Sequence, residues 1–183
     1  DVCSSDLRGM PLGLHGWCGG AGLEPDLRPL FGESIHVPAI LVDASGRMAG
    51  QRYGGLVIPS DLGATLHDLM GNAGPQAAEP WQGRSLGPLL EAWRPVPRDR
   101  VVVRAPGGDA IITPAWHLID AGDVSRDHRS SLYAKPDDFF ERSDVADRCA
   151  DVAEELTRAL GRGCGDPSRA WHVELSAAAR SGV

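Results

Sequence analysis

The chain contains no run of roughly 18 to 20 apolar residues, the length that a membrane span requires. It also has no cluster of basic residues: 18 Lys and Arg stand against 25 Asp and Glu, for a formal net charge of −7. An acidic balance of this kind disfavours nucleic acid and anionic membrane surfaces as partners. Neither a P-loop nor a G-x-G-x-x-G pattern occurs, so these signatures of nucleotide binding are absent too.

Cysteines are few, and no C-x-x-C pair occurs among them. Apart from Cys3, they are Cys18, Cys149 and Cys164, a set that indicates neither a disulfide framework nor a zinc cage. We expect these three thiols to be buried or inert. The six histidines form no H-E-x-x-H pattern and no close metal-binding spacing, so we expect structural or surface roles for them. Only His15, in a glycine-rich segment, is singled out.

What is present is the composition of a globular protein, with 42% hydrophobic and 23% charged residues among 183. That length suffices for one ordinary domain or for a piece of a larger one. The 23 glycines and 14 prolines predict short helices and strands separated by many turns.

The first seven residues, DVCSSDL, read back through GAC-GTG-TGC-TCT-TCC-GAT-CT, which resembles the end of a common sequencing adapter. A natural polar strand or loop is the alternative. We interpret residues 1–7 as an artefact and exclude them from reasoning about the fold. This interpretation predicts that the natural upstream sequence is missing, and it leaves the cellular location unknown.

In the first half, residues 35–43 form a nearly continuous apolar run, which predicts a strand buried on both faces, with Pro38 at its start or at a bulge. Ser60 is expected to cap a helix that ends at Gly71 and whose apolar face consists of Leu62, Leu66, Leu69 and Met70. Residues 72–82 have the composition of a linker, and a short helix is expected from Ser85 through Trp93.

The second half predicts a small antiparallel sheet. Its four β-type runs cover residues 100–105, 109–113, 115–120 and 131–135, and Pro-Gly-Gly at 106–108 closes the first pair as a hairpin. A helix should then start at Asp144 or Asp147 and end at Gly161, with Val152, Leu156, Ala159 and Leu160 on its apolar face. A last helix fits Asp166 as N-cap and Gly182 beyond its end.

Two short patterns have competing interpretations. Gly83-Arg84-Ser85-Leu86-Gly87 matches the G-x-S-x-G nucleophile elbow, but residues 79–82 do not read as the strand that the elbow requires. Ser85 as a helix N-cap explains the same residues without catalysis. The pair Asp137-Asp138 is either a carboxylate pair or, following Pro136, a turn or strand-end cap, and we favour the turn.

Several segments, in order, resemble the C-terminal part of the sulfatase family of the alkaline phosphatase superfamily. Residues 11–16, PLGLHG, are similar to the family's P-L-G-E-H-G loop, and residues 30–41, LFGESIHVPAIL, to its L-Y-E-E-x-x-H-V-P-L-I-I segment. Residues 58–69 resemble the V-x-x-x-D-L-x-P-T-L-L-D-L helix, and residues 83–90 the G-x-S-L-x-P-L-L helix. Residues 131–138 with 144–146 are similar to the closing E-L-Y-D-L-x-x-D-P-x-E-x-x-N-L-A.

The resemblance, which covers roughly residues 9–160, implies an α/β fold. The chain would be the C-terminal fragment of an alkaline-phosphatase-like sulfatase fold, with a small antiparallel-sheet plus helix subdomain. Residues 8–94 would end the catalytic domain, residues 95–161 would form the subdomain, and residues 162–183 a helix or tail.

The family implies a Ca²⁺-assisted hydrolase of small-molecule or carbohydrate sulfate esters, in which a formylglycine made from cysteine attacks sulfur. Its nucleophile motif C/S-x-P-x-R does not occur at any of the 14 prolines, so the nucleophile and most metal ligands would lie upstream. By this resemblance His15 is the candidate catalytic residue and Arg28 the candidate substrate-binding residue. No metal ligand is assigned within the chain.

Two alternatives remain open. A phosphodiesterase or phosphonate-ester hydrolase of the same superfamily would share these C-terminal segments. A catalytically inactive relative acting as a binding module is the other, because Leu14 stands where the family has Glu and Leu27-Arg28 stand where it has an active-site Lys.

Overall fold

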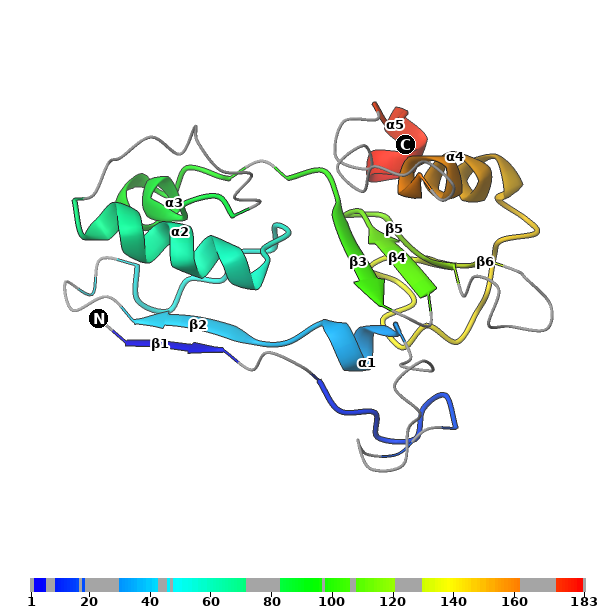
Figure 1. Cartoon of the computed structure of the whole chain (residues 1–183), viewed down its shortest axis with the longest axis horizontal. Helices are drawn as coiled ribbons and strands as arrows, with labels where there is room; N and C mark the ends of the chain where they lie inside the picture. The colour runs from blue at the N-terminus through cyan, green and yellow to red at the C-terminus, as the bar shows by residue number, and fades with distance from the viewer. Residues whose placement is uncertain are drawn as a thin grey trace. The chain divides into compact units, whose positions relative to one another are not determined.

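The computed structural model describes residues 2–5, 9–16, 18, 30–42, 46, 48–71, 83–96, 98–105, 108–120, 130–161 and 174–182. The chain divides into two units, which are described separately below (Figure 1). The first unit comprises residues 1–7 and 37–98, and the second comprises residues 8–36 and 99–183. The subdomain boundaries expected from the family resemblance stay a prediction.

The second unit is built on a four-stranded antiparallel sheet of order β3-β4-β5-β6. Its strands match the four predicted runs to within one residue at every end. They are β3 (Val101–Ala105), β4 (Gly108–Ile112), β5 (Trp116–Asp120) and β6 (Ser130–Ala134). The predicted hairpin is confirmed, because Ala105 pairs with Gly108 across the first turn.

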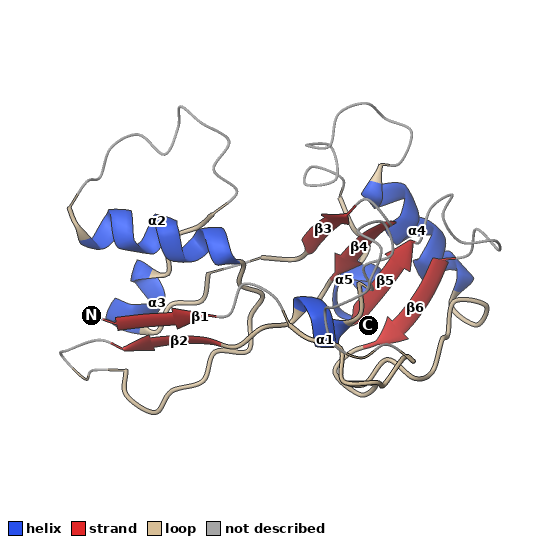
Figure 2. Cartoon of the chain, turned by 60° about the horizontal axis from the view of Figure 1, so that its bottom comes forward, coloured by secondary structure: helices blue, strands red, loops and turns tan. Residues whose placement is uncertain are grey.

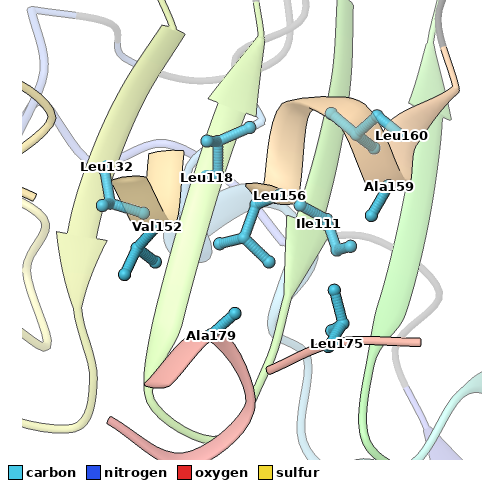
Figure 3. Packing of buried hydrophobic residues seen from close by; sticks show 9 residues of the cluster. All are labelled: Ile111, Leu118, Leu132, Val152, Leu156, Ala159, Leu160, Leu175 and Ala179. Carbon is cyan, nitrogen blue, oxygen red and sulfur yellow. The ribbon is translucent and has the colours of Figure 1, made fainter. Parts of the chain in front are cut away.

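Helix α4 (Ala150–Leu160) covers one face of this sheet and completes the core (Figures 2 and 3). Ile111, Leu118 and Leu132 are cross-strand neighbours and are fully buried. The predicted apolar face of α4 is confirmed, because all four of its residues are buried against them, namely Val152, Leu156, Ala159 and Leu160. Gly161 ends the helix as predicted, at φ 65°, a conformation that glycine adopts without steric cost.

The predicted start of α4 is wrong. The helix begins after Cys149, not at Asp144 or Asp147. Asp144 instead accepts hydrogen bonds from the backbone N–H groups of Leu132 and Ala146, at 3.0 and 2.9 Å. Its carboxylate therefore ties the turn before the helix to strand β6, which a local capping pattern does not distinguish from an N-cap.

Helix α5 (Ala177–Ser181) closes the described part of this unit. Ser176 is its N-cap and accepts from Ala179 N, and Gly182 ends it as predicted. Leu175 and Ala179 join the buried core (Figure 3). The expected cap at Asp166 lies outside the described residues, but the expectation of one helix running from there to Gly182 is wrong, because residues 174–176 are not helical.

In the first unit, β2 (Ala39–Val42) begins directly after Pro38, as predicted, and pairs antiparallel with β1 (Val2–Ser5). The expectation that this strand is buried on both faces is wrong here, because Ile40 is 60% and Val42 53% exposed. This exposure means that no layer of described residues covers the apolar side chains of β2, whose hydrogen-bonded neighbour among those residues is β1. Nothing in the structure supports the adapter interpretation of residues 1–7, which stays a prediction.

Helix α2 (Pro59–Leu69) ends near Gly71 as predicted, but its N-cap is Ile58 rather than Ser60. The predicted apolar face is also wrong: Leu66, Leu69 and Met70 are about half exposed or more. The buried face consists instead of Asp61, Ala64 and Thr65.

The backbone before α3 (Gly87–Ala92) explains this orientation of α2. Arg84 N donates to Asp61 Oδ1 at 2.7 Å, and Leu86 N donates to Thr65 Oγ1 at 2.8 Å. Buried backbone N–H groups need acceptors, and an unsatisfied one costs about 1–3 kcal/mol. The polar face of α2 therefore turns inward.

None of the described helices is long and apolar enough to cross a membrane.

We predict that the variant Leu156→Ala, at the fully buried centre of α4, lowers the free energy of unfolding of the second unit by about 2–5 kcal/mol. The matched control Leu69→Ala, on the half-exposed face of α2, should change stability by no more than about 0.5 kcal/mol. Urea unfolding followed by hydrogen exchange in peptides from α4 and α2 measures both. Equal losses would contradict the burial described for the two helices.

Candidate functional site

His15 lies in the second unit, in the loop that resembles the sulfatase segment. Gly13 and Gly16 have φ of 101° and 79°, and Gly16 N donates to Gly13 O at 3.2 Å, so the loop turns tightly around His15. The loop is fastened to α1 (Gly32–Ile35) at two points. Gly9 N donates to Ser34 O at 2.9 Å, and Leu12 N donates to Glu33 Oε2 at 3.2 Å.

The imidazole of His15 is enclosed by three contacts. Its ring stacks on Phe31, with centroids 3.6 Å apart and planes 2° from parallel. Its Nδ1 is 3.2 Å from Glu33 Oε1, and its Nε2 is 3.0 Å from the backbone oxygen of Glu141. Both ring nitrogens therefore face protein oxygens, and 13% of the side chain is exposed.

Glu141 is the most heavily bonded carboxylate near this loop. Its Oε1 accepts from His117 Nδ1 and from Lys135 Nζ, each at 2.7 Å, and its Oε2 accepts from Gly32 N at 2.7 Å. Only 2% of the residue is exposed. We call these residues, together with His15, the Glu141 cluster.

The electrostatics of the cluster favour the ionised carboxylate. Burial alone would raise the pKa of Glu141, but the hydrogen bond and charge of His117, followed by the bonds from Lys135 and Gly32, outweigh it. The pKa falls from 4.5 to about 2. The cluster is thus a set of matched donors and acceptors around a fixed negative charge, suited to holding segments together.

Strand β5 explains why His117 reaches this site. Along the strand side chains alternate between the faces, so Leu118 points into the core under α4 and His117 points to the other face. Its cross-strand partner Tyr133 lies on the same face, with its ring 6.1 Å from that of Phe31. Among the described residues, His117 Nε2 has no hydrogen-bond partner.

The turn after β6 completes the site. Lys135 Nζ donates to Asp138 O at 3.1 Å and Phe139 O at 3.3 Å, in addition to Glu141. Asp138 accepts from Arg142 N and Ser143 N at 3.0 and 2.9 Å, which confirms the predicted turn and cap role.

Sequence reasoning found His15 but missed Glu141, His117 and Lys135. A signal for Glu141 existed: it stands three residues after Asp138, the spacing of D-P-x-E in the family's closing segment. His117 and Lys135 are single polar residues in or beside a strand, and no local pattern distinguishes them. Arg28, the predicted substrate-binding residue, lies outside the described residues, as do Leu27 and Cys164.

Calcium does not fit the residues described here. These residues contain no group of three or more His, Cys, Asp or Glu that could hold a metal ion. The carboxylates nearest His15 already face other groups: Glu33 faces Leu12 N and the imidazole, and Glu141 accepts its three donors. Cys18 is free and exposed, so it is not one of the buried thiols expected from the sequence, and its inertness stays a prediction; Cys149 is free and partly buried.

In the first unit, Asp61 forms a second buried carboxylate centre. Its Oδ1 accepts from Arg98 at 2.6 Å and from Arg84 N at 2.7 Å, and its Oδ2 accepts from Ile58 N at 2.9 Å. Asp61 is 1% exposed, and the Arg98 side chain is 3% exposed. These contacts join α2, the start of α3 and the segment after it, which is a structural role.

Ser85 of the G-x-S-x-G pattern is part of the same junction. Its Oγ donates to Asp68 Oδ2 at 2.6 Å and accepts from Gly87 N at 3.0 Å. Residues 83–86 contain no strand. The prediction that Ser85 is the N-cap of α3 is wrong by one residue, because the N-cap is Leu86. Ser85 nevertheless accepts a hydrogen bond from the N–H group of Gly87, the first residue of the helix.

Comparisons with known proteins add little to this geometry. No family model matches the chain, and no curated protein matches it. Among solved structures, the chain is similar to a Bacteroides thetaiotaomicron protein labelled BT33336S-sulf, from work on the metabolism of multiple glycosaminoglycans. The identity is 24% and the TM-score 0.44, and the match covers 55% of this chain and 23% of that one. The chain thus spans less than a quarter of that protein's length.

We predict that Glu141 makes the free energy of unfolding fall as pH falls, and that this contribution is lost in the variant Glu141→Gln. Because the pKa of Glu141 is lowered from 4.5 to about 2 on folding, its contribution is present above pH 4.5 and is lost as pH falls through about 2. At about 1.4 kcal/mol per pKa unit the contribution is about 3 kcal/mol, of which about 2 kcal/mol is lost by pH 3. Urea unfolding between pH 6 and pH 3 measures the difference between wild type and variant. The exposed-residue control Glu154→Gln should keep the wild-type slope, and an unchanged slope in Glu141→Gln would refute the assignment.

We predict that Asp61→Ala destabilises the first unit by about 3–5 kcal/mol, because it removes the buried carboxylate that pairs with Arg98 and accepts from two backbone N–H groups. Ser60→Ala serves as the control and should cost no more than about 0.5 kcal/mol, since Ser60 is exposed and is not the N-cap. Urea unfolding, followed by hydrogen exchange in peptides from α2, measures the loss of stability in both variants. A larger loss for Ser60→Ala would restore Ser60 as the cap.

Proposed function

We propose that the chain is the C-terminal part of a sulfatase-like hydrolase of sulfate esters. The observation that carries this proposal is that three separate segments with the family resemblance meet in one place. Residues 11–16 contribute His15, residues 30–41 contribute Phe31, Gly32 and Glu33, and the segment from 131 to 146 contributes Glu141. Unrelated chance matches along a chain have no reason to converge on one hydrogen-bonded cluster.

The first unit supports the same proposal independently. The two helix segments that resemble the family, residues 58–69 and 83–90, are joined directly by Asp61 and Thr65. The exposed apolar side chains of β2 are also consistent with a strand whose further partners belong to a larger sheet.

Within this proposal, the second unit supports the His15 loop beside the reacting centre. The nucleophile and Ca²⁺ of such an enzyme would be held by residues outside this chain, and a small-molecule or carbohydrate sulfate ester is the proposed substrate. Arg28 remains the proposed contact to the substrate. For His15, the two engaged ring nitrogens favour a role in fixing the loop over direct proton transfer.

The same contacts at His15 favour one other function. A catalytically inactive relative that binds an ester, or another ligand, would keep the scaffold of the Glu141 cluster while lacking reactive groups. Leu14, in place of the family's Glu, agrees with that alternative.

The test begins with the DNA of the source. We expect sequence upstream of the Arg8 codon to encode, in frame, a C/S-x-P-x-R motif and an Asp-rich metal segment. The complete protein should then hydrolyse an aryl sulfate in the presence of Ca²⁺, and the chain of 183 residues alone should not.

Each other result assigns a different function. Preferential hydrolysis of an aryl phosphodiester by the complete protein would favour the phosphodiesterase alternative. An upstream sequence without nucleophile or metal carboxylates would refute the hydrolase and leave the binding module.

A further inference from the structure

We infer that Glu141 is a positioning residue for His15. It holds the imidazole through a direct contact with its backbone oxygen and through an indirect one with its carboxylate. An effect of this positioning on catalysis rests on the proposed function. The positioning itself rests on the contacts alone. Glu141 lies 126 residues after His15, so no local pattern around His15 reveals its partner.

One contact reaches the imidazole directly, and the other acts through the backbone of α1. The backbone oxygen of Glu141 is 3.0 Å from His15 Nε2. The carboxylate of Glu141 accepts from Gly32 N at 2.7 Å, and Gly32 lies between Phe31, which stacks on the imidazole, and Glu33, which faces its Nδ1. Loss of the Glu141 side chain therefore releases the segment that supplies the other two contacts of the ring.

The contact with the backbone oxygen also assigns a proton. A carbonyl oxygen only accepts hydrogen bonds, so His15 Nε2 must be the N–H donor. An imidazole held in this way presents no lone pair at Nε2. His15 can accept a proton through Nε2 only after it leaves Glu141.

The backbone of Glu141 is consistent with a fixed carbonyl direction. Its φ is 55°, in the left-handed region that non-glycine residues rarely adopt. Such a conformation persists only where the surroundings determine it. Here Lys135, His117 and Gly32 hold the side chain, and Glu141 N donates to Asp138 O at 3.2 Å.

The first measurement needs no variant. In the ¹⁵N-labelled chain, long-range ¹H–¹⁵N correlation spectra report which imidazole nitrogens carry protons, and His15→Gln identifies the His15 signals. We expect Nε2 of His15 to be protonated, with a single slowly exchanging signal. An unprotonated Nε2, or averaging between two tautomers as in a free imidazole, would overturn the inference.

The second measurement compares three variants. In Glu141→Ala we expect the His15 signals to move to tautomer averaging and hydrogen exchange at residues 11–16 to rise at least about tenfold. Glu141→Gln keeps an oxygen acceptor for Gly32 N and should recover part of the wild-type behaviour. Arg142→Ala, at the exposed neighbouring position, should match the wild type.

A Glu141→Ala protein with an intact sheet and unchanged His15 signals would refute the positioning role. If that variant does not fold, the protonation state of His15 in the wild type decides alone.

Activity in the complete protein separates this inference from the proposed function. In an active hydrolase, Glu141→Ala should lower kcat more than it raises KM, and Glu141→Gln should rescue part of the loss. If the complete protein is inactive but the His15 signals respond as expected, the proposed function fails and the positioning role stands. If it is active and Glu141→Ala changes neither kcat nor the His15 signals, the positioning role fails alone.

Discussion

A carboxylate removed from water is the constraint on which the second unit depends. An ionised group in that position is tolerated only when donors surround it, because the desolvation penalty of a buried charge is several kcal/mol. The donors to Glu141 come from strand β5, from the turn after β6 and from the N-terminus of α1. Satisfying one side chain therefore holds α1 and the turn after β6, which contribute no residue to the apolar core, against strand β5.

The two faces of the sheet are consequently stabilised by different interactions, apolar packing on one and polar contacts on the other. On one face, Ile111, Leu118 and Leu132 pack against α4, and burial of apolar surface drives the association. On the other face, His117 is hydrogen-bonded to Glu141, and the ring of Tyr133 lies near that of Phe31 at the start of α1. Apolar packing tolerates exchange of similar side chains, whereas a matched polar cluster depends on every partner and so specifies one arrangement.

The first unit also contains a buried carboxylate that is surrounded by hydrogen-bond donors. Asp61 is almost fully buried and is matched by one guanidinium and two backbone N–H groups. Its need for donors sets the rotation of α2, and the apolar stripe from Leu66 to Met70 remains outside.

The parts of the structure that local patterns predicted are those governed by local physics. Alternation and turn residues placed the four strands, and the 3.6-residue period of α4 with Gly161 at its end gave the face it buries. For α2 the same period pointed to the wrong face, because the deciding acceptors serve backbone N–H groups 20 or more residues away. His117 and Lys135 could not be identified from the sequence for a related reason: a single polar residue carries no periodic pattern, and its partners are set by the tertiary fold.

The distance in sequence between His15 and Glu141 has a consequence for synthesis on the ribosome. Residues 8–36 belong to the same unit as residues 99–183, with the first unit inserted between them. At about 5–20 residues per second, the 126 residues that separate the two partners take roughly 6 to 25 s to translate. During that interval the His15 segment has emerged without its binding partner. A chaperone or protease that recognises nascent chains would meet residues 9–16 and 30–36 in that state, before the sheet that holds them exists.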